Sequence, residues 1–145
     1  MDRELYQEII LSHFRSPKWK EALTDASDVG IAKNPNCGDI VKLKATLDDG
    51  GCLQLVHDAQ GCAASVASCS ILCDKLNGLG LDEATERVGR FLLALQADET
   101  ADPGWSGDVE IDALLFFRNV PARRLCVSLA WSCAQNALAA LVKAR

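Results

Sequence analysis

One stretch of the sequence, residues 40–59, restricts the possible folds more than any other. Apolar and polar side chains alternate from Ile40 to Leu47, which is typical of a half-buried strand. The run Asp48-Asp49-Gly50-Gly51 then has the composition of a hairpin turn. Alternation resumes after it, and one face of the returning strand carries Leu53, Leu55, His57 and Ala59. The sequence therefore predicts a small antiparallel sheet.

Apolar residues recur at helical spacing on both sides of this hairpin. Before it, residues 4–14 predict an amphipathic helix that ends at Ser16-Pro17, because the residue before a proline avoids the α region. From Asp25 to Pro35 we expect irregular chain. After the hairpin, a helix rich in small residues is expected from about Ala63 to Leu76, where Asn77-Gly78 stops it.

The second half of the chain is predicted to be mostly helical. Asp82 has the character of an N-cap for a further helix. The acid-rich stretch from Asp98 to Asp108 is interpreted as an exposed loop, and a short apolar turn is expected from Ile111 to Phe117. Pro121 stands where a long last helix can begin.

These elements predict an α+β fold in which helices pack on one face of an antiparallel sheet of two to three strands. The chain has 145 residues, no internal repeats and no linker long enough to divide it. A single domain over residues 1–145 is therefore expected.

Charge and composition exclude several classes of function. There are 15 Lys and Arg residues against 20 Asp and Glu, a net charge of −5, so we expect no nucleic-acid partner. The chain begins with charged residues and has no apolar stretch of signal-peptide or membrane-span type, so a cytoplasmic protein with no membrane partner is predicted. In a reducing compartment, its seven cysteines are candidates for metal or sulfur chemistry rather than disulfides.

Three of the seven cysteines lie in contexts that favour a thiolate. Cys37 is followed by glycine in a run of turn residues, and Asp39 adds an anionic ligand two residues later. Cys62 lies at a strand-to-helix junction, where the helix dipole lowers the pKa of a thiol. Cys126 follows two arginines near the start of the last helix. No Cys-x-x-Cys pair connects the three, so spacing alone does not place them at one site.

The remaining candidates have plainer interpretations. Four cysteines are interpreted as structural: Cys52, Cys69, Cys73 and Cys133. Of the two histidines, His57 on a sheet face is more often a packed residue than a ligand. Arg118, Arg123 and Arg124 form one local basic cluster, which is either a solvated helix end or a docking patch.

Taken together, three motifs resemble a known family. These are Asn34-Pro35-Asn36-Cys37-Gly38-Asp39, Gly61-Cys62-Ala63-Ala64-Ser65 and Val120-Pro121-Ala122-Arg123-Arg124-Leu125-Cys126. Their order and spacing resemble the SufU and IscU iron–sulfur cluster assembly proteins, the NifU N-terminal-like family, over nearly the whole chain. The long segment between the second and third motifs is similar to the SufU branch.

The resemblance implies one metal site made by Cys37, Asp39, Cys62 and Cys126. It implies zinc in SufU-type proteins, or a transient iron–sulfur cluster in IscU-type scaffolds. The implied partners are a cysteine desulfurase of the SufS or IscS type, which is a pyridoxal-phosphate enzyme, and downstream iron–sulfur acceptor proteins. By the SufU pattern, Cys126 is the expected sulfur acceptor, and the protein is a partner of the desulfurase or a scaffold rather than a stand-alone enzyme. Asp39, the hardest ligand, is expected to be the labile one.

The sequence departs from the family at three positions. Asn36 replaces the usual threonine, and only Pro121 is left of the double-proline segment that a chaperone binds in IscU proteins. Leu125 stands before the third cysteine, where IscU proteins have histidine and SufU proteins commonly lysine. This chain therefore has one ligand or cation fewer beside Cys126.

Two alternatives to sulfur transfer are open at this point. The first is a zinc-stabilised interaction module whose thiols only hold the fold. The second is a cysteine hydrolase that uses His57 as its base, for which two isolated histidines give thin support.

Overall fold

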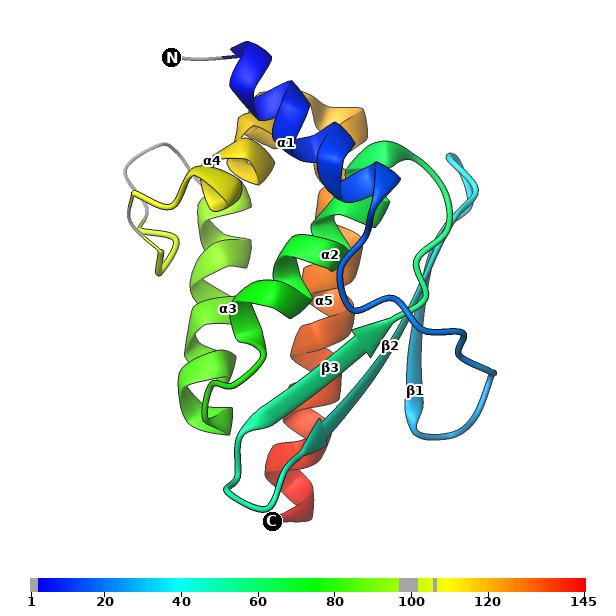
Figure 1. The fold of residues 1–145 in the computed structure, drawn as a ribbon, viewed down its shortest axis with the longest axis vertical. Coiled ribbons are helices and arrows are strands. Elements are labelled where there is room, and N and C mark those ends of the chain that lie inside the picture. Colours follow the sequence, from blue (N-terminus) through cyan, green and yellow to red (C-terminus); the bar gives the residue numbers. More distant parts are fainter. Residues whose placement is uncertain (1–2, 97–101, 106) are drawn as a thin grey trace.

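The computed structural model describes residues 3–96, 102–105 and 107–145. In order, the elements are α1 (Arg3–Arg15), β1 (Val29–Asn34), β2 (Asp39–Leu47), β3 (Leu53–His57), α2 (Ala63–Leu76), α3 (Leu81–Gln96), α4 (Val109–Leu115), the short 3₁₀ helix η1 (Phe116–Asn119) and α5 (Pro121–Ala144). Figure 1 shows the sheet with α5 running behind it. The predicted α+β class is confirmed.

The sheet has three antiparallel strands in the order β1-β2-β3. The predicted hairpin is confirmed, since Leu43 pairs with His57 and Leu47 with Leu53. The core face of β2 and β3 is the predicted one, with Val41, Leu43, Leu53 and Leu55 fully or almost fully buried. The alternation of side chains therefore positioned this hairpin correctly.

The expectation of irregular chain from residue 25 to 35 was wrong, because Val29–Asn34 forms the edge strand β1. Its core face carries Gly30 and Ala32, which pair with Leu43 and Val41. Such small side chains produce no apolar alternation. A larger side chain at position 30 would be crowded, since a Cβ there would lie 3.2 Å from the sulfur of Cys133.

Helices cover one face of the sheet, as predicted. Helix α5 packs on β1 and β2, and α2 packs on β3. Farther from the sheet, α3 lies against α5, and α1 lies against α2 and α4. Buried Trp131 of α5 stacks on Phe91 of α3, with ring centroids 3.8 Å apart.

Helix α5 is long and apolar enough to cross a membrane by length and composition alone. Its buried residues are those of a core helix: Cys126, Val127, Ala130, Trp131, Cys133, Ala134 and Leu138. The packing of α5 against the sheet, α2 and α3 accounts for the apolar residues on its buried face.

Several boundaries differ from the predictions. The expected apolar turn at 111–117 is the helix α4 followed by η1, and the carboxylate of Asp108 caps α4 by accepting from the backbone N–H groups of Glu110 and Ile111. Helix α3 begins at Leu81, so Asp82 lies in its first turn. The predicted loop at 98–108 falls partly outside the described residues. Pro121 does begin the last helix, as predicted.

The Phe91–Trp131 stack gives a test of the core. Phe91→Ala should lower the free energy of unfolding by about 3–5 kcal/mol, because it leaves a cavity beside Trp131. Leu93→Ala is the matched control on the same helix, since Leu93 is 67% exposed and its truncation should change stability by less than about 0.5 kcal/mol. Urea unfolding curves of the two variants should therefore differ clearly; similar midpoints would contradict this packing.

Candidate metal centre

Three junctions of the chain meet at one end of the sheet. Because β1 and β2 are antiparallel, the turn between them lies where β2 begins, and β3 ends at that same end. The chain after β3 continues along β2, since Ile40 and Gln60 exchange two backbone hydrogen bonds of 2.9 Å. The first turn of α2 and the early part of α5 complete this end. The topology thus brings together segments that are far apart in the sequence.

The first junction presents Cys37 at the tip of a tight turn. Asn34 and Asp39 pair across it, and the backbone N–H groups of Cys37 and Gly38 both bond to the carbonyl of Asn34, at 3.2 and 2.9 Å. Gly38 has a φ of +71°, a conformation that favours glycine. The side chain of Cys37 is exposed.

The second junction joins Asp39 to Cys62. The buried carboxylate of Asp39 accepts the backbone N–H of Cys62 at 2.9 Å, and its other oxygen lies 3.6 Å from the Cys62 sulfur. Gly61 makes this approach possible. A Cβ at Gly61 would collide with the Asp39 carboxylate and lie 2.8 Å from its Cα, and its φ of +134° also excludes most side chains.

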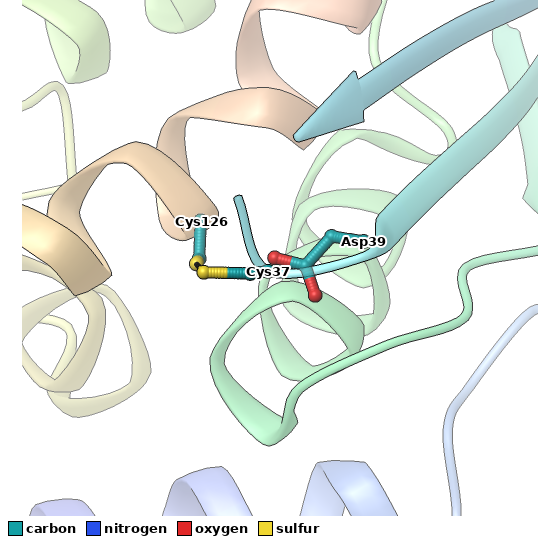
Figure 2. Close-up of side chains that lie close together, drawn as sticks. All are labelled: Cys37, Asp39 and Cys126. Carbon is teal, nitrogen blue, oxygen red and sulfur yellow. Dashed lines mark hydrogen bonds between the residues drawn. The ribbon is translucent and has the colours of Figure 1, made fainter. Parts of the chain in front are cut away.

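The third junction supplies Cys126 from α5. Its sulfur lies 3.8 Å from that of Cys37, and the buried side-chain amide of Asn34 donates to it at 3.7 Å. Figure 2 shows the sulfur atoms of Cys126 and Cys37 side by side, with Asp39 near them. The sulfurs and a carboxylate oxygen of Cys37, Asp39 and Cys126 all lie within 4.8 Å of one another. Cys62 adjoins this group through Asp39.

These distances fit a tetrahedral zinc site. Two thiolates that bind one zinc ion at about 2.3 Å are separated by about 3.8 Å when the geometry is tetrahedral. The sulfurs of Cys37 and Cys126 have this separation, 3.8 Å. A thiolate and a carboxylate oxygen on the same ion lie slightly closer together, which agrees with the 3.6 Å between Cys62 and Asp39. Cys37, Asp39 and Cys126 therefore have the spacing of ligands to one metal ion, and Cys62 lies beside Asp39, outside the group whose ligand atoms are all within 4.8 Å of one another.

Without a cation, the same arrangement opposes a charged thiolate at Cys126. Burial raises the pKa of the Cys126 thiol, and its contacts with Asp39, Cys62 and Cys37 raise this pKa further. A cation bound among these groups would act in the opposite direction. The donor set is thus chemically suited to a positive ion.

Comparisons with known proteins agree with this architecture. The family model of the NifU-like N-terminal domain matches residues 5–97. This chain belongs to that family. The match includes Cys37, Asp39 and Cys62.

The relatives are of two kinds. The chain is 30% identical over 135 residues to a zinc-dependent sulfurtransferase SufU of Bacillus subtilis, covering 93% of this chain and 90% of the relative. It is 29% identical over 138 residues to an iron–sulfur cluster assembly scaffold protein IscU of Thermotoga maritima, with 92% of each chain covered.

A solved structure supports the fold. A protein of Fervidobacterium islandicum AW-1, described as an iron–sulfur cluster assembly scaffold for the SUF system, superimposes with a TM-score of 0.78 at 25% identity. The match covers 95% of this chain and 99% of that one. The family fold therefore extends through α5, beyond the residues that the family model matches.

The other cysteines agree with their interpretation as structural residues. Cys69, Cys73 and Cys133 are buried, and burial raises the pKa of each thiol, that of Cys133 to about 11. Such thiols are poor nucleophiles at neutral pH. Cys52 is half-buried at the start of β3, the end opposite to the site.

The structure gives no support to a hydrolase that uses His57. Nε2 of this buried ring donates to the carbonyl of Lys18 at 2.9 Å, and Nδ1 accepts from the backbone N–H of Ala59 at 3.2 Å. Burial lowers the pKa of His57, so the ring is neutral at pH 7. His13 also uses both nitrogens, which bond to Ser70 and Glu110. Both rings therefore have structural roles.

The basic cluster divides into two groups. Arg118 donates to the carbonyl of Ala94 at 2.7 Å, and Arg124 donates to the carbonyl of Arg118 at 3.4 Å. The neighbouring thiol of Cys126 instead raises the pKa of Arg123. Leu125 is 48% exposed, so this departure from the family places an apolar side chain on the surface beside Cys126.

Sequence reasoning missed the roles of Asn34 and Gly61. Asn34 belongs to the core face of β1 and is only 2% exposed. A buried polar side chain on a strand is a signal of function or of a specific partner, but this strand was not expected. Gly61 could have been noted as a glycine directly before a candidate ligand.

The contact between Gly61 and Asp39 can be tested by adding one methyl group. Gly61→Ala should weaken zinc binding at least about tenfold, because the side chain of Asp39 must move away from the Cys62 N–H; displaced supports of metal ligands typically cost about 10–100-fold. Gly51→Ala is the control, since Gly51 also has a positive φ but has no atom within 4 Å of its Cβ position. Competition with a chromophoric chelator would measure both affinities. Equal affinities in the two variants would contradict the proposed role of Gly61.

Proposed function

We propose that this protein takes part in iron–sulfur cluster assembly by accepting persulfide sulfur from a cysteine desulfurase at a zinc site. The ligands would be Cys37, Asp39, Cys62 and Cys126. The observation that carries the proposal is the convergence of these four residues at one end of the sheet, with one exposed thiol among them. Membership of the NifU-like N-terminal domain family and the SufU relative support it.

The candidate ligands differ in exposure in a way that suits an external sulfur donor. Cys37 is exposed at the tip of its turn, whereas Cys126 is completely buried behind it. The sequence favoured Cys126 as the acceptor. Because a nucleophile must reach the donor sulfur, the exposures favour Cys37, and we propose Cys37 as the first acceptor. Cys126 remains the alternative acceptor, and locating the persulfide in the protein would distinguish the two cysteines.

Each ligand would have a distinct part in the chemistry. Zinc, when bound, would hold the thiols as thiolates and offset their charge. Asp39 is the hard ligand in a set of sulfur donors, and its anchoring by the Cys62 N–H keeps it at the site if it leaves the ion. The amide of Asn34 steadies Cys126, so that Cys37 is the thiol most free to move outward.

The IscU relative favours a second candidate function, the holding of a nascent iron–sulfur cluster by the same four residues. A mixed oxygen and sulfur set of ligands would release such a cluster readily. The cluster would pass to downstream iron–sulfur acceptor proteins. The reducing cytoplasm is the compartment we propose, because the seven cysteines are all free.

Zinc content tests the ligand set. We expect one zinc ion in the wild type and a loss of affinity above about 100-fold in Cys37→Ser, Cys62→Ser and Cys126→Ser, because losing a ligand costs more than losing an outer partner. Cys52→Ser, at the other end of β3, should keep its zinc. Metal analysis after dialysis against a weak chelator measures this, and unchanged zinc in Cys37→Ser would eliminate the site.

Desulfurase turnover, with and without the zinc-loaded protein, separates the functions. Stimulated turnover and a persulfide on Cys37, located by mass spectrometry, are the expected results. Label on Cys126 would support the sequence-based choice instead. Cluster formation without stimulation would mean a scaffold, and an absence of label on any cysteine would favour the zinc-stabilised interaction module.

Asp39 variants test the labile ligand. Asp39→Ala should slow sulfur transfer and lengthen the lifetime of a reconstituted cluster against a chelator, because the weakest ligand is gone. Asp39→Asn is the matched variant, since its amide oxygen can still accept the Cys62 N–H without the negative charge. An unchanged cluster lifetime in both variants would refute the labile role.

A further inference from the structure

The two edges of the sheet differ in how their backbone groups are bonded. The outer edge of β3 is covered by segments that are not strands. Leu53 and His57 both bond to the backbone of such segments. Between them, the side-chain amide of Asn77 donates to the carbonyl of Leu55 at 3.0 Å, and its oxygen accepts the Leu55 N–H. A further strand could pair with β3 only if these groups moved away.

The outer edge of β1 is open. Ile40 of β2 bonds on the β3 side, so its neighbour Val41 directs its backbone groups to Ala32 of β1. This direction alternates along a strand, so Ile31 and Lys33 direct their N–H and C=O groups away from β2. Within the described residues, no hydrogen bond reaches these groups. Two N–H and two C=O groups are therefore free at this edge.

A groove lies beside the open edge, between β1 and α5. Its volume is about 460 Å³, and small or medium-sized side chains line it, including Gly30 and Ala32 from β1 and Ala137, Ala140 and Leu141 from α5. Figure 1 shows β1 at one edge of the sheet, with α5 behind. The groove is thus hollow on the helical side of the sheet, next to the unbonded backbone groups of β1.

The exposed part of α5 lacks the charges that are usual on a solvated helix. Between Arg124 and Lys143 the helix has no charged residue. Only 39% of its most apolar 18-residue stretch is buried. Packing within the chain therefore leaves much of this uncharged helix uncovered, and part of the uncovered surface lines the groove. Exposed surfaces of this kind mark interaction sites.

A second copy of this chain would fit the surface poorly. An antiparallel copy of β1 centred on Ile31 would place Ala32 of each copy opposite Gly30 of the other. The side chains turned toward the groove would then be those of glycine and alanine, as they are in β1 itself. These are too small to fill it. The occupant must instead be a strand with bulky apolar side chains on that face.

Lys33 adds a preference for charge at one end of the edge. Its side chain is exposed and forms no ion pair with any described residue. In an antiparallel pair, the residue opposite Lys33 would lie on the same face of the sheet, where an acidic side chain is favourable. The residues opposite Ala32 and Gly30 would lie on the other face, toward the groove.

We propose that the edge of β1 and this groove bind an extended segment of a partner protein as a fourth, antiparallel strand. Along that segment, an acidic residue lies opposite Lys33, a bulky apolar residue opposite Ala32, any residue opposite Ile31 and a second bulky apolar residue opposite Gly30. The backbone of Ile31 and Lys33 supplies four hydrogen bonds, and the two apolar side chains are buried in the groove. The inference goes beyond the proposed function and does not depend on a bound metal.

Amide hydrogen exchange, followed by NMR, tests the open edge in the free protein. The N–H groups of Ile31 and Lys33 should exchange at least about tenfold faster than those of Gly30 and Ala32, which bond to β2. Protection of Ile31 and Lys33 that increases with protein concentration would mean that a second copy occupies the edge. Protection at every concentration would mean that the edge is covered within the chain. Either result would overturn the proposal.

A library of random peptides displayed on phage tests the chemistry of the partner segment. Selection on the full chain should enrich the pattern acidic–apolar–any–apolar. A synthetic peptide of the enriched sequence should slow the amide exchange of Ile31 and Lys33 at least about tenfold at saturation. No enrichment of this pattern, or a bound peptide that leaves both amides unprotected, would contradict the proposal.

Two variants locate the bound peptide. Ile31→Pro removes one outward N–H and leaves the bonds to β2 in place, because proline is tolerated on an edge strand where its nitrogen faces solvent. It should weaken peptide binding at least about fivefold. Ile31→Val, the matched control at a position that is 41% exposed, should stay within about twofold of the wild type. Ala140→Trp fills the groove from α5 and provides the test if Ile31→Pro does not fold.

The charge of Lys33 is tested with a pair of peptides. Lys33→Gln should weaken the selected peptide about two- to fivefold, and it should not weaken the same peptide with glutamine in place of its acidic residue. Fluorescence anisotropy of labelled peptides measures all these affinities. Wild-type affinity in Ala140→Trp, or equal effects of Lys33→Gln on the two peptides, would refute the placement of the segment.

Discussion

The site depends on one hydrogen bond, from the backbone N–H of Cys62 to the carboxylate of Asp39. It joins the first residue of β2 to the N-terminus of α2, a favourable place for a negative charge. The bond is possible because Gly61 has no side chain and because residue 60 is paired with residue 40. The position of Cys62 is thereby set by the backbone of the sheet. Cys37 depends on the same contact, since its turn ends at Asp39.

Much of the fold was predictable because its local signals are strong. The hairpin alternates cleanly over residues 40–59, and Pro121 marks the first turn of α5. Strand β1 could not be predicted in the same way, because Gly30 and Ala32 give it no apolar alternation. Its small residues are explained only by the approach of Cys133 from α5, which is a tertiary contact.

The sequence indicated candidate ligands but not how the fold would arrange them. The contexts of Cys37, Cys62 and Cys126 indicated thiol chemistry, but only the resemblance to a family joined them. The three arginines formed one cluster in the sequence, whereas in the structure Arg118 and Arg124 donate to backbone carbonyls. Exposure divides the cysteines further, and no local pattern reveals that Cys37 faces solvent while Cys126 is buried.

The convergence of three distant segments has a further consequence for stability. An ion held by Cys37, Cys62 and Cys126 would cross-link the turn before β2, the start of α2 and the start of α5, as disulfides do in secreted proteins. Such a cross-link closes long loops and so lowers the entropy of the unfolded chain. Unlike a disulfide, it forms and breaks with the concentration of free metal. The rigidity of this end of the molecule would then follow the metal supply of its compartment.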